Sequence, residues 1–118
     1  MNPTTSAATR LFTLTSEEIN GHTILVCNGS LVAEGTESFK QQVRTILAEG
    51  RPIILDLSGV KKMDSSGLGA LVAVWVSSKS GGCPLRFYSL SEPVKQLLGL
   101  THVLKAFEAC GSHLTKLP

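Results

Sequence analysis

The sequence has few charged residues, few aromatic residues and no long apolar run. Charged side chains make up 17% of the 118 residues, aromatic side chains make up 5%, and the formal net charge is +2. The basic residues are scattered and are not interleaved with aromatic ones, which argues against nucleic-acid binding. No apolar run reaches the length that a bilayer span requires, so membrane insertion is not expected.

Cysteine and histidine are also scarce. Cys27, Cys83 and Cys110 are odd in number and widely spaced, which argues against a disulfide framework and fits a reducing cytoplasm. The three histidines do not lie at ligand spacing from them, so neither a metal site nor another cofactor is predicted. Residues 1–10 have no basic segment followed by an apolar one, so they are predicted to be a flexible lead-in rather than a signal peptide.

The length and the apolar share of the chain are sufficient for one domain. An apolar share of 42% in 118 residues is typical of a single globular domain with its own core. We assign residues 11–109 to this domain and residues 110–118 to a short C-terminal tail.

The order of apolar patterns predicts an α/β fold. Two alternating strands at 11–15 and 22–27 flank Asn20-Gly21, a tight-turn signal, and should form a hairpin. Segment 53–57 is almost unbroken in its apolar character, as in a strand covered on both faces, and 58–62 should carry the chain across its end. Further strands are expected at 85–88 and 103–107, and helices at 34–49, 66–79 and 92–98.

Strands and helices alternate after the hairpin, which implies parallel strands joined by helical crossovers. The expected architecture is a mixed, mostly parallel sheet of about five strands with an N-terminal hairpin and helices packed on it. Ligands and partners of such sheets usually meet the loops at the carboxyl ends of the strands. The segment Asp64-Ser65-Ser66 should lie at such an end.

The helix at 66–79 has two candidate faces. One is an apolar stripe that includes Trp75, which is expected to be a core residue packed against the central strand. The other consists of small apolar residues, which are either plain helix formers or a flat surface where a partner packs. The members of the stripe are Leu68, Leu71, Val72, Trp75 and Val76, and those of the small face are Ala70, Ala73 and Val74.

The start of this helix is the most informative segment. Asp64 or Ser65 can cap it, because a short side-chain oxygen accepts from a free helix N–H. Gly67 and Gly69 lower helix propensity, which makes sense if something approaches that backbone closely. Neither a Gly-x-Ser-x-Gly elbow, nor a dinucleotide fingerprint, nor a phosphate loop is present, so an enzyme is not predicted.

Two stretches resemble the signature of STAS domains, and within that group the bacterial anti-sigma factor antagonists. They are Asp56-Leu57-Ser58-Gly59-Val60 and Met63-Asp64-Ser65-Ser66-Gly67-Leu68-Gly69, and the resemblance extends over residues 11–107. It implies that Ser65, the serine directly after the aspartate, is phosphorylated by a partner kinase. Ser66 is the alternative, although its hydroxyl is more suited to local backbone hydrogen bonds.

The resemblance also implies the partners. The unphosphorylated protein would bind an anti-sigma factor that is also a serine kinase and so release a sigma factor, and a phosphatase would reset the phosphoserine. Ser65 would then be a substrate in a cytoplasmic protein that is not an enzyme. The implied partner-binding residues are Asp64, Ser65, Ser66, Gly67, Leu68, Ala70, Ala73 and Val74.

One departure from the family pattern keeps an alternative open. Relatives often carry Gly-x-Leu-Asp at the exit of the second hairpin strand, whereas this chain has Gly29-Ser30-Leu31-Val32. The missing aspartate lies near the phosphorylation loop in relatives. The alternative is a constitutive STAS scaffold subunit of a stress-signalling complex or of a lipid-transporting ATPase, although the intact Asp64-Ser65-Ser66-Gly67 favours the switch.

Overall fold

The segment that the sequence predicts to be a buried strand forms β4 (Ile53–Met63), an interior strand of the sheet. The computed structural model describes residues 4–8, 12–80, 85–103 and 105. Along the chain the elements are β1 (Thr4–Ala8), β2 (Phe12–Ile19), β3 (His22–Leu31), α1 (Ala33–Ala48), β4 (Ile53–Met63), α2 (Ser65–Ser80), β5 (Arg86–Leu90) and α3 (Glu92–Leu100).

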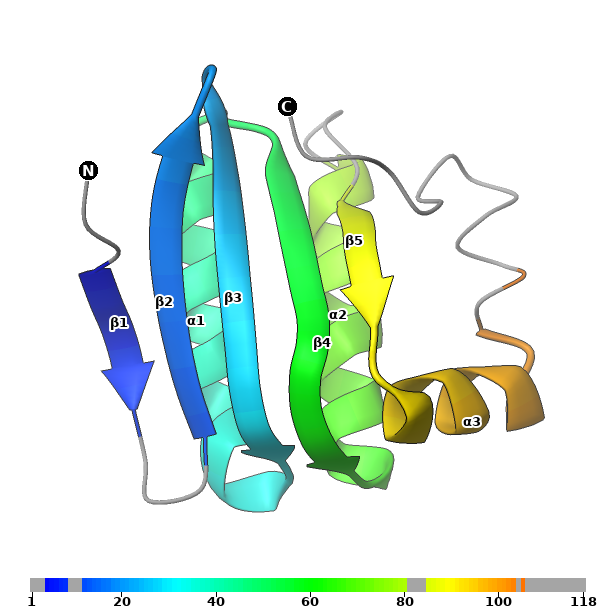
Figure 1. The fold of residues 1–118 in the computed structure, drawn as a ribbon. Coiled ribbons are helices and arrows are strands. Elements are labelled where there is room, and N and C mark those ends of the chain that lie inside the picture. The colour runs from blue at the N-terminus through cyan, green and yellow to red at the C-terminus, as the bar shows by residue number, and fades with distance from the viewer. Residues whose placement is uncertain (1–3, 9–11, 81–84, 104, 106–118) are drawn as a thin grey trace.

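The strands form one sheet in the order β1-β2-β3-β4-β5, so β4 is an interior strand as predicted (Figure 1). Strands β2 and β3 form the predicted antiparallel hairpin. Its turn places Asn20 at a φ of 51° and Gly21 at a φ of 81°, a conformation that favours Asn-Gly. Strands β3, β4 and β5 are parallel to one another.

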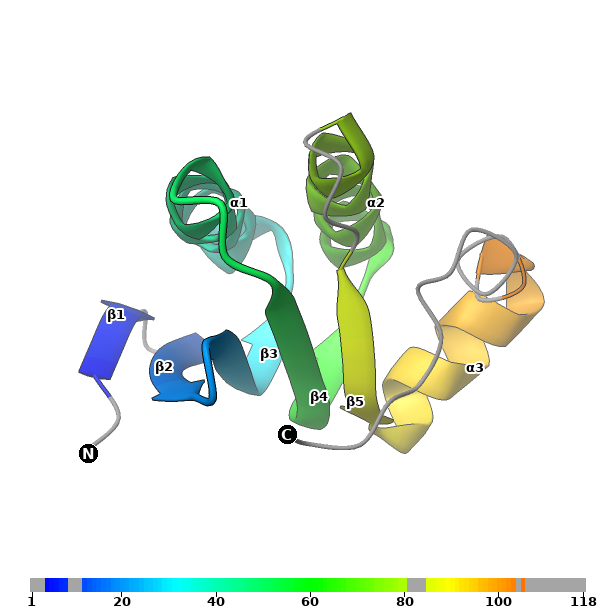
Figure 2. The same cartoon turned by 90° about the horizontal axis from the view of Figure 1, so that it is seen from above.

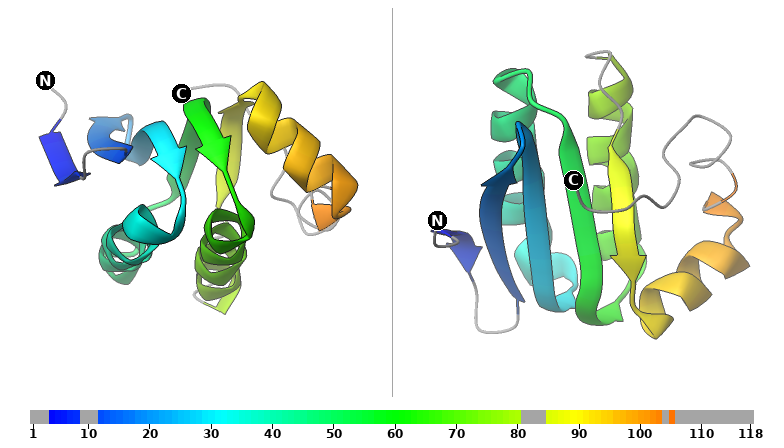
Figure 3. Two further views of the ribbon diagram at one scale, coloured as in Figure 1. Left: turned by 90° about the horizontal axis from the view of Figure 1, so that it is seen from below. Right: turned by 45° about the horizontal axis from the view of Figure 1, so that its top comes forward.

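Helices α1 and α2 lie side by side on one face of the sheet, and α3 lies beyond the edge formed by β5 (Figures 2 and 3). The core cluster lies between this helix pair and the sheet and also includes Val94 and Leu98 of α3. Phe39 of α1 meets Phe12 of β2 edge to face, with ring centroids 6.3 Å apart, and Leu71 of α2 is fully buried in the same cluster. This packing fixes both helices, and therefore the loops that begin them.

Strand β4 is longer than the sequence indicated. Residues 58–62 continue the strand instead of forming a loop, and Val60 is buried opposite Gly29 of β3. At Gly59 a Cβ would lie 1.9 Å from Asn28 Oδ1, so glycine serves close approach between strands. The Ser-Gly and Lys-Lys pairs suggested a loop, but pairing with β3 decides the conformation.

The predicted N-terminal lead-in also contains structure. Residues 4–8 form β1, which pairs antiparallel with β2, from Thr4 opposite Ser16 to Ala8 opposite Thr13. A polar segment with no apolar alternation becomes an edge strand because β2 offers it a row of unpaired backbone groups. This adds a second antiparallel pairing, so the four strand pairings of the described sheet divide equally between parallel and antiparallel.

The predicted last strand is not observed where the structure describes it. After α3 the chain turns at Thr101 and His102, and the φ of His102 is 60°. Val103 and Lys105 are then helical. The rest of the predicted strand, residues 104, 106 and 107, and the predicted tail at 110–118 lie outside the described residues.

Candidate partner-binding and phosphorylation site

The loop between β4 and α2 lies at the carboxyl edge of the parallel strands. Met63, the last residue of β4, is paired with Leu31, the last residue of β3. Consequently the N-termini of α1 and α2 start from adjacent strand ends at the same edge of the sheet (Figure 1). Val32, which stands where relatives often carry aspartate, is the half-buried N-cap of α1 at this edge.

Asp64 caps α2. Its Oδ1 accepts a hydrogen bond from the backbone N–H of Gly67 at 3.0 Å, and its carbonyl oxygen accepts from the N–H of Leu68 at 3.0 Å. Of the two predicted caps, Asp64 is therefore the one used. Ser65 and Ser66 become the first and second residues of the helix.

Both serine side chains are exposed. In the part of the chain that the structure describes, neither hydroxyl has a hydrogen-bond partner, so the expected local bond of Ser66 is not formed. Both hydroxyls are therefore accessible from solvent. Burial and hydrogen bonding do not distinguish Ser65 from Ser66 as the candidate phosphorylation site.

The two glycines of the first turns have different roles. A Cβ at Gly67 would lie 2.1 Å from the carbonyl oxygen of Leu31 and 2.9 Å from Met63 Cγ, whereas a Cβ at Gly69 would meet nothing within 4 Å. The close approach predicted for this backbone is thus internal at Gly67, where α2 rests on the end of β3. Gly67 is buried and is not available as the partner contact that was predicted.

The predicted docking face of α2 is wrong in part. Ala70 and Val74 are buried, with 3% and 0% of their surface exposed, and belong to the core. Ala73 is half-buried, and Val76, which was placed in the core, is 51% exposed. Small side chains let α2 lie close to the sheet and to α1, so packing turns the small face inward.

The outer face of α2 is nevertheless apolar. Leu68 and Val72 are partly buried on this face, and Gly69 and Val76 are exposed. Residues 65, 69, 72 and 76 follow one another at helical spacing, so this surface continues directly from Ser65. The candidate surface predicted from the sequence did not include Gly69, Val72 and Val76, although their spacing from Ser65 could have indicated them.

Trp75, which is predicted to be a core residue, lies at the border between the core and the surface of α2. It is half-buried and packs against the core cluster, so it contributes to the core without being enclosed by it. Lys79 Nζ lies 4.8 Å from the centroid of its ring, a cation–π contact on the outer side of the helix.

The chemistry available near this loop is limited. Burial, followed by the nearby Asp56 carboxylate, raises the pKa of the Cys27 thiol, which therefore stays protonated and is a poor nucleophile. His22 lies at the hairpin turn, the opposite end of β3 from Leu31, and so cannot serve as a base for Ser65. Among the described residues no group of three His, Cys, Asp or Glu side chains is arranged to hold a metal ion.

None of the described helices combines the length and the apolar character needed to cross a membrane.

The family model of the STAS domain matches residues 13–115 of this chain, and the chain belongs to that family. The mixed sheet, the helix pair on one face and the capped loop at the carboxyl edge are thus those of a STAS domain.

Solved structures of anti-sigma factor antagonists are similar in fold. A putative anti-sigma factor antagonist from Thermotoga maritima matches with a TM-score of 0.75 and 27% identity, over 88% of this chain and 87% of that one. The anti-sigma factor antagonist SpoIIAA in its unphosphorylated form matches with a TM-score of 0.65 and 17% identity, over 89% of both chains. The fold of this chain therefore matches these two structures over most of their length.

The same fold occurs within a much larger protein. The murine anion transporter Slc26a9 matches with a TM-score of 0.67 and 21% identity, over 86% of this chain but only 17% of that one. Likeness at this identity shows the fold alone.

Proposed function

We propose that this protein is a cytoplasmic anti-sigma factor antagonist regulated by phosphorylation of Ser65. The observation that carries the proposal is an exposed serine at the first position of α2, directly after the capping Asp64, beside the apolar outer face of the helix. The protein is a substrate in this switch and not an enzyme. Its partners are an anti-sigma factor that is also a serine kinase, and a phosphatase that acts on the phosphoserine.

The unphosphorylated surface is suited to protein binding. The apolar outer face of α2 has Ser65 and Ser66 at one end, with Leu68, Gly69, Val72 and Val76 along it and Ala73 at its border. A partner that covered this face would remove apolar area from water, and the absence of a side chain at Gly69 would let it approach the backbone. This revised surface replaces Gly67, Ala70 and Val74 of the predicted set.

A phosphate on Ser65 would act mainly on this interface. It would add close to two negative charges at a helix N-terminus, where the helix dipole favours an anion. The Asp64 carboxylate, held in place by Gly67, would oppose it. Because these two local effects have opposite signs, little refolding is expected, whereas a dianion buried against a partner is costly to desolvate.

The test is phosphosite mapping on the protein isolated from its native cells, using wild type, Ser65→Ala and Ser66→Ala. Phosphate is expected on Ser65 in wild type and in Ser66→Ala, and no phosphate is expected in Ser65→Ala. The two serines are matched controls, since both are exposed and neighbouring. Phosphate on Ser66 in the Ser65→Ala variant, at the wild-type level, would contradict the assignment.

The second candidate is a constitutive scaffold subunit of a stress-signalling complex or of a lipid-transporting ATPase. Val32 favours it, because this N-cap of α1 brings no carboxylate to the edge where Ser65 lies. The candidates differ in what co-purifies from native cells. A sigma-regulating kinase that binds wild type and not Ser65→Asp supports the switch, whereas a transporter or signalling complex that binds both equally supports the scaffold.

A further inference from the structure

A cavity of about 350 Å³ lies at the opposite end of the parallel strands from Ser65, between the β2–β3 hairpin and the C-terminal end of α1. This volume is at the lower end of the range typical of small-molecule sites. The cavity has no part in the proposed switch. Its walls include Glu17, Glu18, Thr23, Thr45, Glu49 and Arg51.

The charge of the cavity is negative. Three carboxylates and one guanidinium line it, so their formal sum is −2. Helix α1 ends here, with its C-cap at Glu49 and no basic residue in its last turn. The negative end of the helix dipole therefore adds to the carboxylates, and the cavity favours a cation over an anion.

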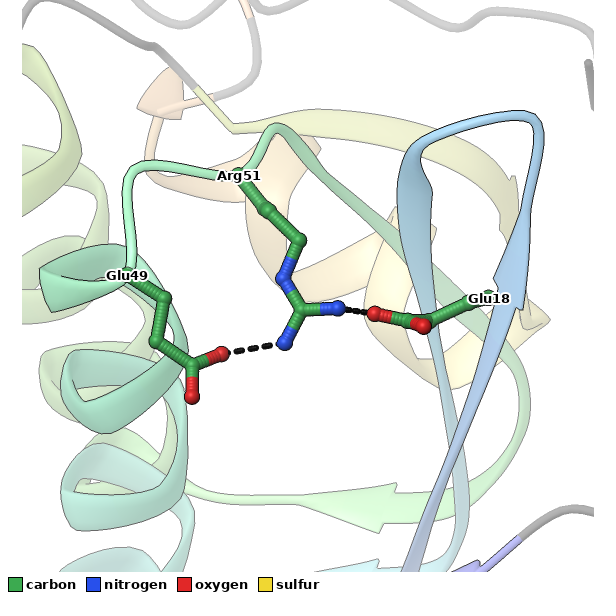
Figure 4. A network of polar contacts seen from close by, with 3 residues as sticks. All are labelled: Glu18, Glu49 and Arg51. Carbon is green, nitrogen blue, oxygen red and sulfur yellow. Dashed lines mark hydrogen bonds and ion pairs between the residues drawn. The ribbon is translucent and has the colours of Figure 1, made fainter.

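Arg51 already shows where a cation binds. Its guanidinium lies between Glu18 and Glu49 and contacts both carboxylates (Figure 4). The three side chains are between 39% and 50% exposed, so each ion pair is weak and exchangeable. Arg51 can turn into solvent without losing a buried partner. The acidic groups are thus accessible to a competing cation.

An independent feature points to a ligand. Thr23 is only 3% exposed, lines the cavity, and lies opposite Glu18 in the hairpin. Its backbone N–H donates to the carbonyl oxygen of Pro52, but its buried Oγ1 has no hydrogen-bond partner within the described residues. An unsatisfied buried hydroxyl is unfavourable, and a hydrogen-bond donor that reached it from the cavity would remove that cost.

We propose that this cavity binds a small aliphatic diamine, with one ammonium group against Glu18 and Thr23 and the other against Glu49. An ammonium group carries three donors and no acceptor, which suits carboxylates and an unpartnered hydroxyl. Ile46, which is 6% exposed, also lines the cavity and gives the methylene chain an apolar contact. The diamine replaces Arg51 at the carboxylates.

The experiment is a titration of the isotopically labelled full chain with 1,4-diaminobutane at constant ionic strength, followed through the backbone amide resonances. Saturable shifts are expected at Ser16, Thr23 and Thr45, which line the cavity. The neutral isostere 1,4-butanediol is the ligand control and should give no saturable shift. Equal shifts with the diol, or saturable shifts confined to other regions, would overturn the proposal.

Variants make the test specific. Glu18→Gln and Glu49→Gln should each weaken binding about tenfold, whereas Glu37→Gln, on the same helix but in a separate exposed pair with Lys40, should leave it unchanged. Arg51→Met should strengthen diamine binding, because it removes the competing cation. Weaker diamine binding by Arg51→Met would contradict the proposal. An equal loss of affinity in Glu37→Gln and Glu49→Gln would show a general effect of charge and would also contradict it.

Thr23→Val separates the hydroxyl from the carboxylates. The two side chains have nearly the same shape, and the change removes an unsatisfied buried group, so the fold should be retained. The diamine should bind this variant several-fold more weakly. Unchanged binding in a folded Thr23→Val protein would contradict the assigned contact. Failure of diamine binding would not affect the proposed Ser65 switch, because the two sites lie at opposite ends of the parallel strands.

Discussion

At the residue scale, the environment of a side chain decides its role more than its type does. Gly67 and Gly69 are two positions apart, yet one faces the Leu31 carbonyl and the other faces open space. Asp64 and Ser65 are both good helix caps, yet only Asp64 makes the capping bond, and Ser65 is exposed without one.

The two glycines allow a matched test of the packing of α2. Gly67→Ala should destabilise the protein by about 1–3 kcal/mol, because the added methyl group overlaps backbone that cannot move freely. Gly69→Ala should stabilise it by about 0.5–1 kcal/mol through helix propensity. Urea unfolding of both variants checks this, and equal effects would mean that α2 does not rest on Leu31 as described.

Burial of Cys27 predicts a pH dependence. Because the pKa of the folded thiol is raised above its ordinary value near 9.0, the unfolded chain loses this proton first as the pH rises. The Cys27 contribution to stability is therefore constant below about pH 8 and falls above about pH 9. Unfolding free energies of wild type and Cys27→Ala at pH 8 and pH 10 measure it.

The wild type should lose more stability between these two pH values than Cys27→Ala does, because the variant has no thiol to ionise. The other titrating groups are shared by both proteins and cancel in the comparison. An identical loss in the two proteins would show that the thiol is not protected by burial.

At the scale of elements, α2 carries most of the proposed function. Its outer face must contact the partner while its inner face supports the sheet. Both faces are apolar, with Val74 fully buried and Val76 half exposed two residues later. The helix can serve both purposes only because α1 and β4 fix its rotation.

Val74 and Val76 form a pair that tests this orientation. Val74→Ala should cost roughly 2 kcal/mol of unfolding free energy, because it removes two buried methyl groups and leaves a cavity. Val76→Ala should change stability by less than about 0.5 kcal/mol and should instead weaken partner binding. Thermal unfolding and partner titration of both variants decide the matter, and reversed effects would mean that the helix is turned the other way.

At the scale of the whole molecule, the two proposed sites lie at opposite ends of the parallel strands. The Ser65 loop lies at the carboxyl ends of β3 and β4, and the acidic cavity lies near their amino ends. A parallel pair of strands separates the two sites by its own length. The two can therefore be changed independently.

Ser65→Asp should separate folding from binding. A single charge at the first position of α2 meets a favourable helix dipole and an unfavourable Asp64, so the unfolding midpoint should stay near that of wild type. Affinity for the partner should fall by at least tenfold, about 1.4 kcal/mol, if the charge is desolvated in the interface. Ser66→Ala is the binding control, since it adds no charge.

A Ser65→Asp protein that binds as tightly as wild type would remove the switch and favour the scaffold. Loss of binding together with loss of the fold would contradict the claim that charge at Ser65 acts on the interface.

Features that depend on neighbours along the chain could be predicted from the amino-acid sequence. Asn20-Gly21 sets the hairpin turn because that pair adopts positive φ, and the three predicted helices appear where their apolar periodicity lies. Asp64 and Ser65 were predicted at the start of α2 because cap residues act within one turn. These signals are local, and no distant contact overrides them.

Features that depend on residues far apart in the chain could not be predicted in this way. The face of α2 that is buried could not be predicted, because a helix that is apolar on all sides has no preferred phase until α1 and β4 pack against it. Residues 4–8 and 58–62 became strand because β2 and β3 pair with them. Backbone pairing and close packing are long-range interactions, and a single sequence does not reveal which surfaces they bring together.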